Sequence, residues 1–212
     1  MVLCVAWLSR RRILAEAGSL LCDEDQLVPA EVIVVSSTIG RAGAMEASLL
    51  YRQRLSARIV MADWMHDPLA GTIRDLGIPY LDVTELSQAI LERSGVPVSA
   101  VTVLPQQVDG TESEGAAIAA FVNRHHPGSL LVITARTHTA RTKLLLRRKL
   151  PHDIRVSVRS SRFDAFSADS WWRARDQTRE VLVEYLRWVN TLLLPNLWPP
   201  PASVEPTRLA LN

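Results

Sequence analysis

The chain has 212 residues, of which 48% are hydrophobic and 22% charged, the composition of an ordinary globular protein long enough to bury a core. A formal net charge of +2 is too balanced to predict nucleic-acid binding. Two cysteines, Cys4 and Cys22, exclude a disulfide framework and lack the spacing of zinc ligands.

Residues 1–28 raise the question of a membrane. An apolar run at residues 2–8 is followed at once by Arg10, Arg11 and Arg12. A membrane-spanning helix needs about 20 apolar residues, and a signal peptide carries its positive charges before its apolar stretch. The segment matches neither pattern. Three interpretations of this N-terminal helical segment stay open: the remnant of a membrane anchor, an amphipathic helix on a membrane surface, or an ordinary N-terminal helix.

Strand-like and helix-like patterns alternate through the rest of the chain. Short apolar, β-branched runs predict strands at residues 31–36, 57–62, 78–83, 101–104, 129–134 and 154–158. Stretches between them predict helices at residues 40–54, 68–76, 85–94, 112–126 and 139–149, then a long helical stretch, with or without a break, at 169–194. This alternation predicts an α/β domain with a mainly parallel sheet over residues 29–194, followed by an irregular proline-rich tail at 195–212.

The start of the helix expected at residues 112–126 is acidic. Thr111 and Glu114 have the spacing of a capping box, which accounts for both side chains. That motif does not need Asp109 or Glu112. Two explanations stay open for these acids: the helix dipole favours them, or they belong to a functional site beyond the end of a strand.

A cluster of cations follows the clearest strand, which ends in Thr134. Arg136, His138 and Arg141 lie at or just before the start of the next helix. Cations are unfavourable there because a helix N-terminus is already positive. A phosphate or carboxylate ligand bound to free N–H groups and to these side chains would remove the conflict. An internal ion pair with an acid such as Glu112 would remove it too, so both hypotheses stay open.

Two other strand ends carry candidate ligand-binding residues. The turn after the first strand offers hydroxyls, backbone N–H groups and one cation, from Ser36, Ser37, Thr38 and Arg41. This is a weak phosphate-loop pattern, and ordinary turn chemistry also explains it. The second strand ends in Asp63 and Trp64, whose ring either stacks on a flat ligand or packs in a loop. No metal-ligand spacing and no G-x-S-x-G esterase elbow occurs in the sequence.

These segments, in this order, resemble the YdcF-like family, a bacterial domain family that includes the SanA and ElyC envelope proteins. The strongest match is residues 132–141, which are similar to the family's strand-end pattern of V-T-S, a short link and H-x-x-R. Residues 109–114 look like the family's D-x-T-x-E-N-A helix start, with Glu112 or Glu114 as its acidic residue depending on the alignment. Trp171 and Glu180, with the aromatic-rich stretch behind them, are similar to its C-terminal region.

Further matches and departures lie nearer the N-terminus. Arg41 and Glu46 match the family's arginine-then-acid helix, and residues 11–27 look like the segment between its membrane anchor and its domain. Two turns depart from the family, because Ser36-Ser37-Thr38 and Ala62-Asp63-Trp64 stand where glycines are usual. Side chains at these turns restrict how closely a ligand can approach the backbone.

The resemblance implies a Rossmann-like three-layer sandwich with a long C-terminal helix. It also implies a bacterial protein that is cytoplasmic or associated with the inner membrane through its N-terminus, with a role in upkeep of the cell envelope and its peptidoglycan. No cofactor is required by the resemblance, although one family member is described as binding S-adenosylmethionine.

One functional hypothesis is an enzyme, a hydrolase or transferase acting on an anionic envelope precursor. The two arginines near Thr134, together with Arg41, would bind the anion, and His138 with Glu112 or Glu180 would transfer protons.

The alternatives need no catalysis. A regulatory module would bind S-adenosylmethionine or a nucleotide, with Trp64 stacking on the base and Asp63 or Glu112 accepting from ribose hydroxyls. A structural envelope factor would keep the fold without a working pocket.

Overall fold

The sheet is parallel throughout, as expected for an α/β sandwich. The computed structural model describes residues 2–65 and 67–193, and its strands in that part of the chain form one five-stranded sheet of order β3-β2-β1-β4-β5. The strands are β1 (Val32–Val35), β2 (Ile59–Trp64), β3 (Val101–Val108), β4 (Ser129–Thr134) and β5 (Arg155–Ser160). This order is that of a Rossmann-like fold, with its switch point between β1 and β4. The Rossmann-like α/β fold is therefore confirmed, whereas the tail of residues 195–212 lies outside the described residues.

The two central strands explain why the sequence reads as continuous apolar runs. β1 lies between β2 and β4, with Val34 opposite Val60 on one side and Val132 on the other. All four residues of β1 and all six of β4 are buried. A strand buried on both faces cannot alternate between apolar and polar residues, so it appears as an unbroken β-branched run.

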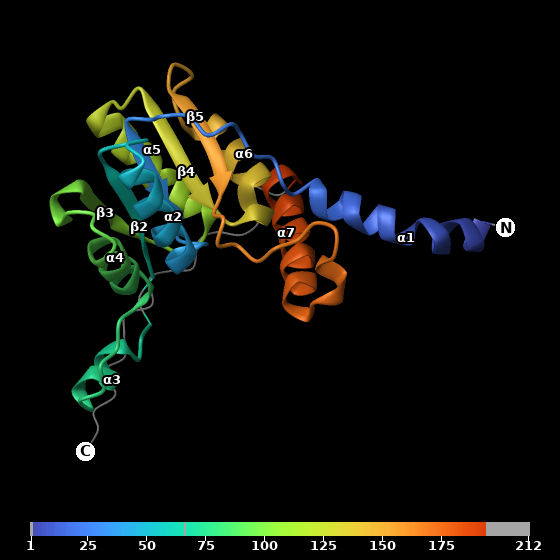
Figure 1. The fold of residues 1–212 in the computed structure, drawn as a ribbon, viewed down its shortest axis with the longest axis horizontal. Helices are drawn as coiled ribbons and strands as arrows, with labels where there is room; N and C mark the ends of the chain where they lie inside the picture. The colour runs from blue at the N-terminus through green and yellow to red at the C-terminus, as the bar shows by residue number, and fades with distance from the viewer. Residues whose placement is uncertain (1, 66, 194–212) are drawn as a thin grey trace.

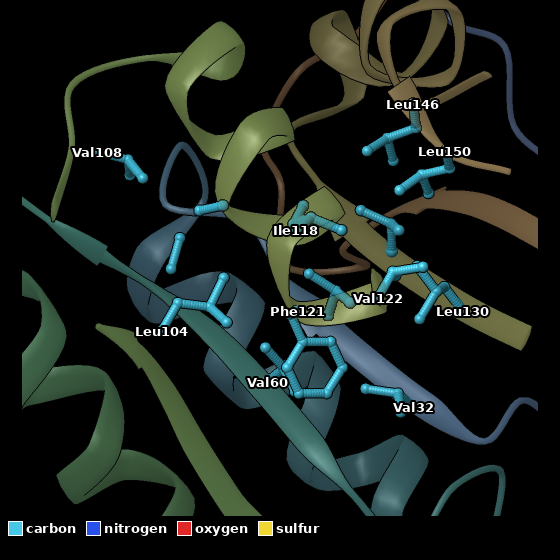
Figure 2. Close-up of a cluster of buried hydrophobic side chains, with 14 of the residues drawn as sticks. Val32, Val60, Leu104, Val108, Ile118, Phe121, Val122, Leu130, Leu146 and Leu150 are labelled. Carbon is cyan, nitrogen blue, oxygen red and sulfur yellow. The ribbon is translucent and has the colours of Figure 1, made fainter. Parts of the chain in front are cut away.

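Helices cover both faces of the sheet (Figure 1). On one face, Ile33 and Val35 pack with buried residues of α2 (Gly40–Arg52) and α4 (Val83–Arg93). On the other, Val32 and Val34 pack with α5 (Thr111–His125) and α6 (Thr139–Lys149), through a cluster whose larger members are Ile118, Phe121, Val122 and Leu146 (Figure 2). Successive residues of β1 thus supply two separate cores.

The C-terminal helix α7 (Arg175–Leu193) lies along α6. Two hydrogen-bonded pairs join the helices, Arg141 with Glu184 and Arg148 with the carbonyl of Thr191, and a third, Thr137 with Glu180, joins the 3-10 turn before α6 to α7. The residues of each pair are 43 positions apart. A constant separation means that the helices run in the same direction. The break in the stretch at 169–194 falls at Ala174, between a short 3-10 helix, Trp171–Arg173, and α7.

The N-terminal helix α1 (Val2–Ser19) extends away from the domain and meets it only at its C-terminal end (Figure 1). The Nε1–H group of Trp171 donates to the carbonyl of Leu14 at 2.8 Å, and the Tyr185 hydroxyl donates to the carbonyl of Ala17 at 2.6 Å. Gly18 permits this approach, because a Cβ atom there would lie 2.7 Å from the Trp171 ring. Among the described residues, no helix is long and apolar enough to cross a membrane.

The connection from α1 to β1 runs beside β5. The Asp25 N–H group donates to the carbonyl of Val158, and the Asp25 carboxylate accepts from the Val158 N–H group, both at 2.9 Å. Lys143, which is buried, donates to Asp23 at 2.7 Å and to Asp25 at 2.9 Å. The connection is therefore held to the domain by both backbone bonds and ion pairs.

Two local predictions are wrong. Residues 78–83 form no strand but connect the short helix α3 (Ala70–Asp75) to α4, because Asp82 and Glu85 make a capping box that starts α4 there. The capping box expected from Thr111 and Glu114 is also absent. Ser113 instead accepts from the backbone N–H group of Gly110 at 3.2 Å, which leaves the Glu114 carboxylate for another partner.

Candidate functional site

The carboxyl ends of β1 and β4 meet in a cluster of hydroxyl groups. The hydroxyl oxygens of Ser36 and Thr38 lie 3.0 Å apart, and those of Thr38 and Thr134 lie 3.1 Å apart. The N–H group of Ser36 donates to the carbonyl of Ile133 at 2.9 Å and so extends the pairing of the two strands. This cluster lies at the switch point, where open parallel sheets bind their ligands.

Glu114 is the buried acid of this cluster. Its carboxylate accepts from the Ser36 hydroxyl and from the Ser37 N–H group, each at 2.7 Å, while its side chain is 1% exposed. Burial raises the pKa of Glu114, and hydrogen bonds from the two serines and the charge of Arg141 oppose that rise. The chain has thus placed its own carboxylate where the turn after β1 presents its donors.

The capping-box spacing of Glu114 does not predict this buried role, but another pattern in the sequence does. Glu114 shares a helix face with Ala117, Ile118 and Phe121, all of them buried against the sheet. A residue three positions before one member of an apolar stripe and four before another must point the same way. The helical period therefore places this carboxylate inside the protein rather than at the cap.

A small cavity of about 10 Å³ adjoins the cluster. Its lining includes Ser36 and Ser37 after β1, Trp64 at the end of β2, and Thr84 and Ser87 of α4. Within the part of the chain that the structure covers, the buried hydroxyl oxygen of Ser37 makes no hydrogen bond of ordinary geometry, although it lies close enough to the Glu114 carboxyl to help lower the pKa of that group. A buried polar atom without a partner costs about 1–3 kcal/mol. Such an atom beside a cavity points to a binding partner there.

Asp63 and Trp64 are placed beside this cavity by an irregularity in the sheet. The register of β2 and β3 shifts between Met61 and Asp63, after which Trp64 lies opposite Val108. Shifts of this kind re-aim side chains next to functional sites. The Trp64 N–H group donates to the Thr84 hydroxyl at 3.1 Å, which ties the end of β2 to α4.

The remaining acids of the α5 start are not part of the cluster's hydrogen bonds. The Asp109 carboxylate accepts from the Ser113 hydroxyl at 2.6 Å, and Thr111 is buried. Glu112 pairs with Lys149 at 3.0 Å, at the opposite end of α6 from His138. Eleven helical residues lie between these ends, a rise of about 16 Å. The structure therefore does not bring Glu112 and His138 together.

Arg141 and His138 converge on an acid that the sequence analysis did not single out. Glu184 accepts from Arg141 Nε at 2.5 Å and from Arg141 Nη2 at 3.0 Å, and its Oε2 lies 3.2 Å from His138 Nε2. Arg141 is 4% exposed and Glu184 is fully buried. Arg187 adds a second cation, 3.6 Å from the same carboxylate. An ion-pair network thus stabilises these cations at the start of α6. This agrees with the hypothesis of an internal ion pair, although the acid is Glu184 and not Glu112.

Arg136 is held in a similar way. Its backbone N–H group donates to Asp164 at 2.6 Å, and its guanidinium contacts the Ser160 hydroxyl, the carbonyl of Phe166 and, at 3.4 Å, Glu24. Glu180 is occupied by the Thr137 hydroxyl, and burial raises its pKa. The candidate anion-binding arginines of this turn therefore face carboxylates, and their role in binding an external anion stays a prediction.

His138 is uncharged in the folded protein. Burial lowers its pKa to about 3, and the charges of Arg141 and Arg187 add to the effect. Glu184 alone would favour the imidazolium, but its charge is shared with those arginines. The Nδ1 atom has no hydrogen-bond partner among residues 2–65 and 67–193. A neutral, buried imidazole accounts for the proximity to Glu184 without any proton transfer.

The pKa of His138 predicts that acid weakens the fold. Between pH 6.5 and 3 the unfolded chain binds a proton at this residue that the folded chain does not, so stability decreases as the pH falls. One such proton contributes up to about 1.4 kcal/mol per pH unit. Urea denaturation of the His138→Gln variant, which keeps a donor for Glu184, should therefore show a shallower decrease between pH 6 and 4. Parallel curves for both proteins would contradict the assignment.

Comparison with known proteins gives little further information. No family model matches the chain, and no curated protein matches it. Among solved structures, the chain is similar to the rRNA methyltransferase aviRa from Streptomyces viridochromogenes, at 14% sequence identity and a TM-score of 0.30, over 70% of this chain and 72% of that chain. A similarity at this level implies no activity.

Proposed function

We propose that this protein binds S-adenosylmethionine, or another nucleoside that carries a positive charge, at the carboxyl ends of β1, β2 and β4. The observation that carries the proposal is the buried Glu114 carboxylate at the switch point, beside the Ser37 hydroxyl, which makes no hydrogen bond of ordinary geometry with the described residues. A carboxylate in that position favours a cationic group and hydroxyl donors over a phosphate.

The balance of charge around the cavity supports a cationic ligand. Arg136 and Arg141 are paired with carboxylates of the protein, so they add little positive potential at the end of β1. Glu114 accepts hydrogen bonds from Ser36 and Ser37, which line the cavity, and Asp63 stands in the chain between two lining residues, Ala62 and Trp64. A sulfonium or ammonium group would offset the cost of the buried Glu114 charge, whereas a phosphate would add to it.

The end of β2 suits the nucleoside part of such a ligand. Acidic residues at this position of dinucleotide-binding folds accept from ribose hydroxyls, and Asp63 occupies it here. Trp64 lines the cavity and offers a ring for the base. Since a cavity of about 10 Å³ holds roughly one water molecule, binding requires the Trp64 ring to move aside.

Calorimetric titration tests the proposal directly. S-adenosylmethionine should bind with measurable heat, and S-adenosylhomocysteine, which lacks the sulfonium charge, should bind about tenfold or more weakly, equivalent to about 1.4 kcal/mol. The Glu114→Gln variant should lose most of that preference. The Glu112→Gln variant, which changes an exposed acid of the same helix, is the matched control. Absence of heat at high micromolar S-adenosylmethionine would reject the proposal.

The ordered motifs further support membership of the YdcF-like family and a role in envelope upkeep as part of the same proposal. A second candidate ligand is an anion, favoured by Arg41, which is exposed in the first turn of α2 and makes no ion pair or hydrogen bond within the described chain. Titration with ATP distinguishes the two. Heat with ATP that is lost in Arg41→Ala, and no heat with S-adenosylmethionine, would select the anion.

A further inference from the structure

The outer face of α7 carries apolar side chains in open solvent. Leu182 and Leu186 are 57% and 68% exposed, and Val183 and Val189 are 36% and 46% exposed. Leu182, Val183 and Leu186 line, together with Trp172, a shallow groove of about 650 Å³. Leu182, Leu186 and Val189 recur at intervals of four and three residues, so they form one continuous stripe along the helix.

Cations mark one end of this stripe. Arg175 and Arg179 line the same groove and are exposed, and within the described residues neither makes an ion pair or a hydrogen bond. Two acids of α7 lie elsewhere. Glu180 and Glu184 contact Thr137 and Arg141 on the inner side. Asp176 is exposed one turn before Arg179 and offsets part of its charge. The stripe is therefore apolar with a basic end, where the two arginines outnumber this one acid.

The neighbouring helix α1 also carries exposed arginines and an exposed aliphatic side chain. The hydrogen bond from Tyr185 to Ala17 joins the C-terminal end of α1 to α7, and that from Trp171 to Leu14 joins α1 to the 3-10 helix before α7, while the rest of α1 extends away (Figure 1). On α1, Arg11 and Arg12 are exposed and Ile13 is 58% exposed, with the exposed Glu16 one turn away. Exposed aliphatic side chains with arginines nearby thus occur on both helices.

We infer that the α7 face, defined by Arg175, Arg179, Leu182, Leu186 and Val189, docks on an anionic lipid surface. Charge complementarity decides the partner. A face that combines large aliphatic side chains with unpaired arginines matches the acyl boundary and the negative headgroups of a membrane. A second copy of this chain, presenting the same face, would offer these arginines no acid other than Asp176.

This docking is peripheral, and it differs from the anchor considered for residues 1–28. It uses the C-terminal helix of the folded domain, and it needs no spanning segment. The ligand cavity lies at the ends of β1 and β2, on elements that α7 does not line. Lipid docking and ligand binding are therefore separable properties of the molecule.

Vesicle flotation tests the inference with the full chain. Wild-type protein should float with phosphatidylcholine vesicles that contain phosphatidylglycerol, and neither with pure phosphatidylcholine nor at high salt. Arg175→Gln with Arg179→Gln should weaken partitioning about fivefold for each arginine. Leu186→Asp should abolish flotation, whereas Leu76→Asp, which changes a comparably exposed leucine beyond α3, should leave it unchanged.

Three results would overturn the inference. The first is wild-type protein that stays with the unbound fraction in the presence of phosphatidylglycerol, and the second is equal flotation of the Leu186→Asp and Leu76→Asp variants. The third is a dimer in sedimentation velocity that Leu186→Asp dissociates, since the face would then belong to a second copy. Circular dichroism of each variant establishes that the fold is retained.

Discussion

Glu184→Ala should destabilise the protein by about 3–5 kcal/mol, since removing one partner of a buried ion pair leaves the other charge uncompensated. Arg141, 4% exposed, donates two hydrogen bonds to Glu184, and no other carboxylate contact of Arg141 occurs in the described part of the chain. Small domains are stable by only about 5–15 kcal/mol. Urea denaturation should therefore show a large shift of the midpoint.

Two further variants separate the buried pair from an ordinary salt bridge. Glu112→Ala removes the ion pair with Lys149, in which the Glu112 and Lys149 side chains are 54% and 31% exposed. It should lower the free energy of unfolding by less than about 1 kcal/mol. The double variant Arg141→Met with Glu184→Leu should recover most of the loss, because apolar residues of similar volume replace buried pairs at little cost. A single Glu184→Ala variant as stable as Glu112→Ala would contradict the network.

Glu114→Ala should lower the free energy of unfolding by about 2–5 kcal/mol, because it removes a hydrogen-bond acceptor and not an ion pair. The loss leaves the Ser37 N–H group and the Ser36 hydroxyl without their acceptor, and each unpaired buried donor costs about 1–3 kcal/mol. Glu114→Gln keeps a carbonyl oxygen for the N–H group and should cost far less. Thermal unfolding followed by circular dichroism measures both variants.

The pair of Glu114 variants also separates stability from ligand binding. Glu114→Gln should fold nearly normally and yet lose its preference for the cationic ligand, since its amide carries no charge. If Glu114→Ala were no less stable than Glu114→Gln, the carboxylate would not be the acceptor that holds the turn after β1.

Those parts of the fold that depend on burial could be read from the sequence. The strand at Ser129–Thr134 and the helix at Thr139–Lys149 were predicted to the residue, because an apolar run and a 3.6-residue period mark them directly. Residues 78–83 were misread, since Ile78 and Val83 look apolar yet remain exposed. There the capping of α4 by Asp82, which depends on side-chain geometry, decided the structure.

The sequence predicts where the candidate site lies, but not which acids form hydrogen bonds and ion pairs there. Strand order puts Ser36, Thr38 and Thr134 at one edge, as parallel sheets require. The acids that complete each cluster come from far along the chain: Glu114 is 78 residues from Ser36, and Glu184 is 43 from Arg141. Local spacing suggested a cap for the first and Glu112 in place of the second. Only the packing of α5 and α7 could identify these partners.

The Asp25 contacts with Val158 have a consequence for the chain in concentrated solution. β5 ends the sheet on its side, and an unprotected border strand recruits strands from other molecules. Here the outward N–H and carbonyl groups of Val158 both form hydrogen bonds with Asp25, and the buried Lys143 holds Asp25 in position by an ion pair. The stretch between α1 and β1 thus protects this part of β5 from pairing with a strand of another molecule. Removal of the stretch would expose the backbone groups of Val158 to such pairing.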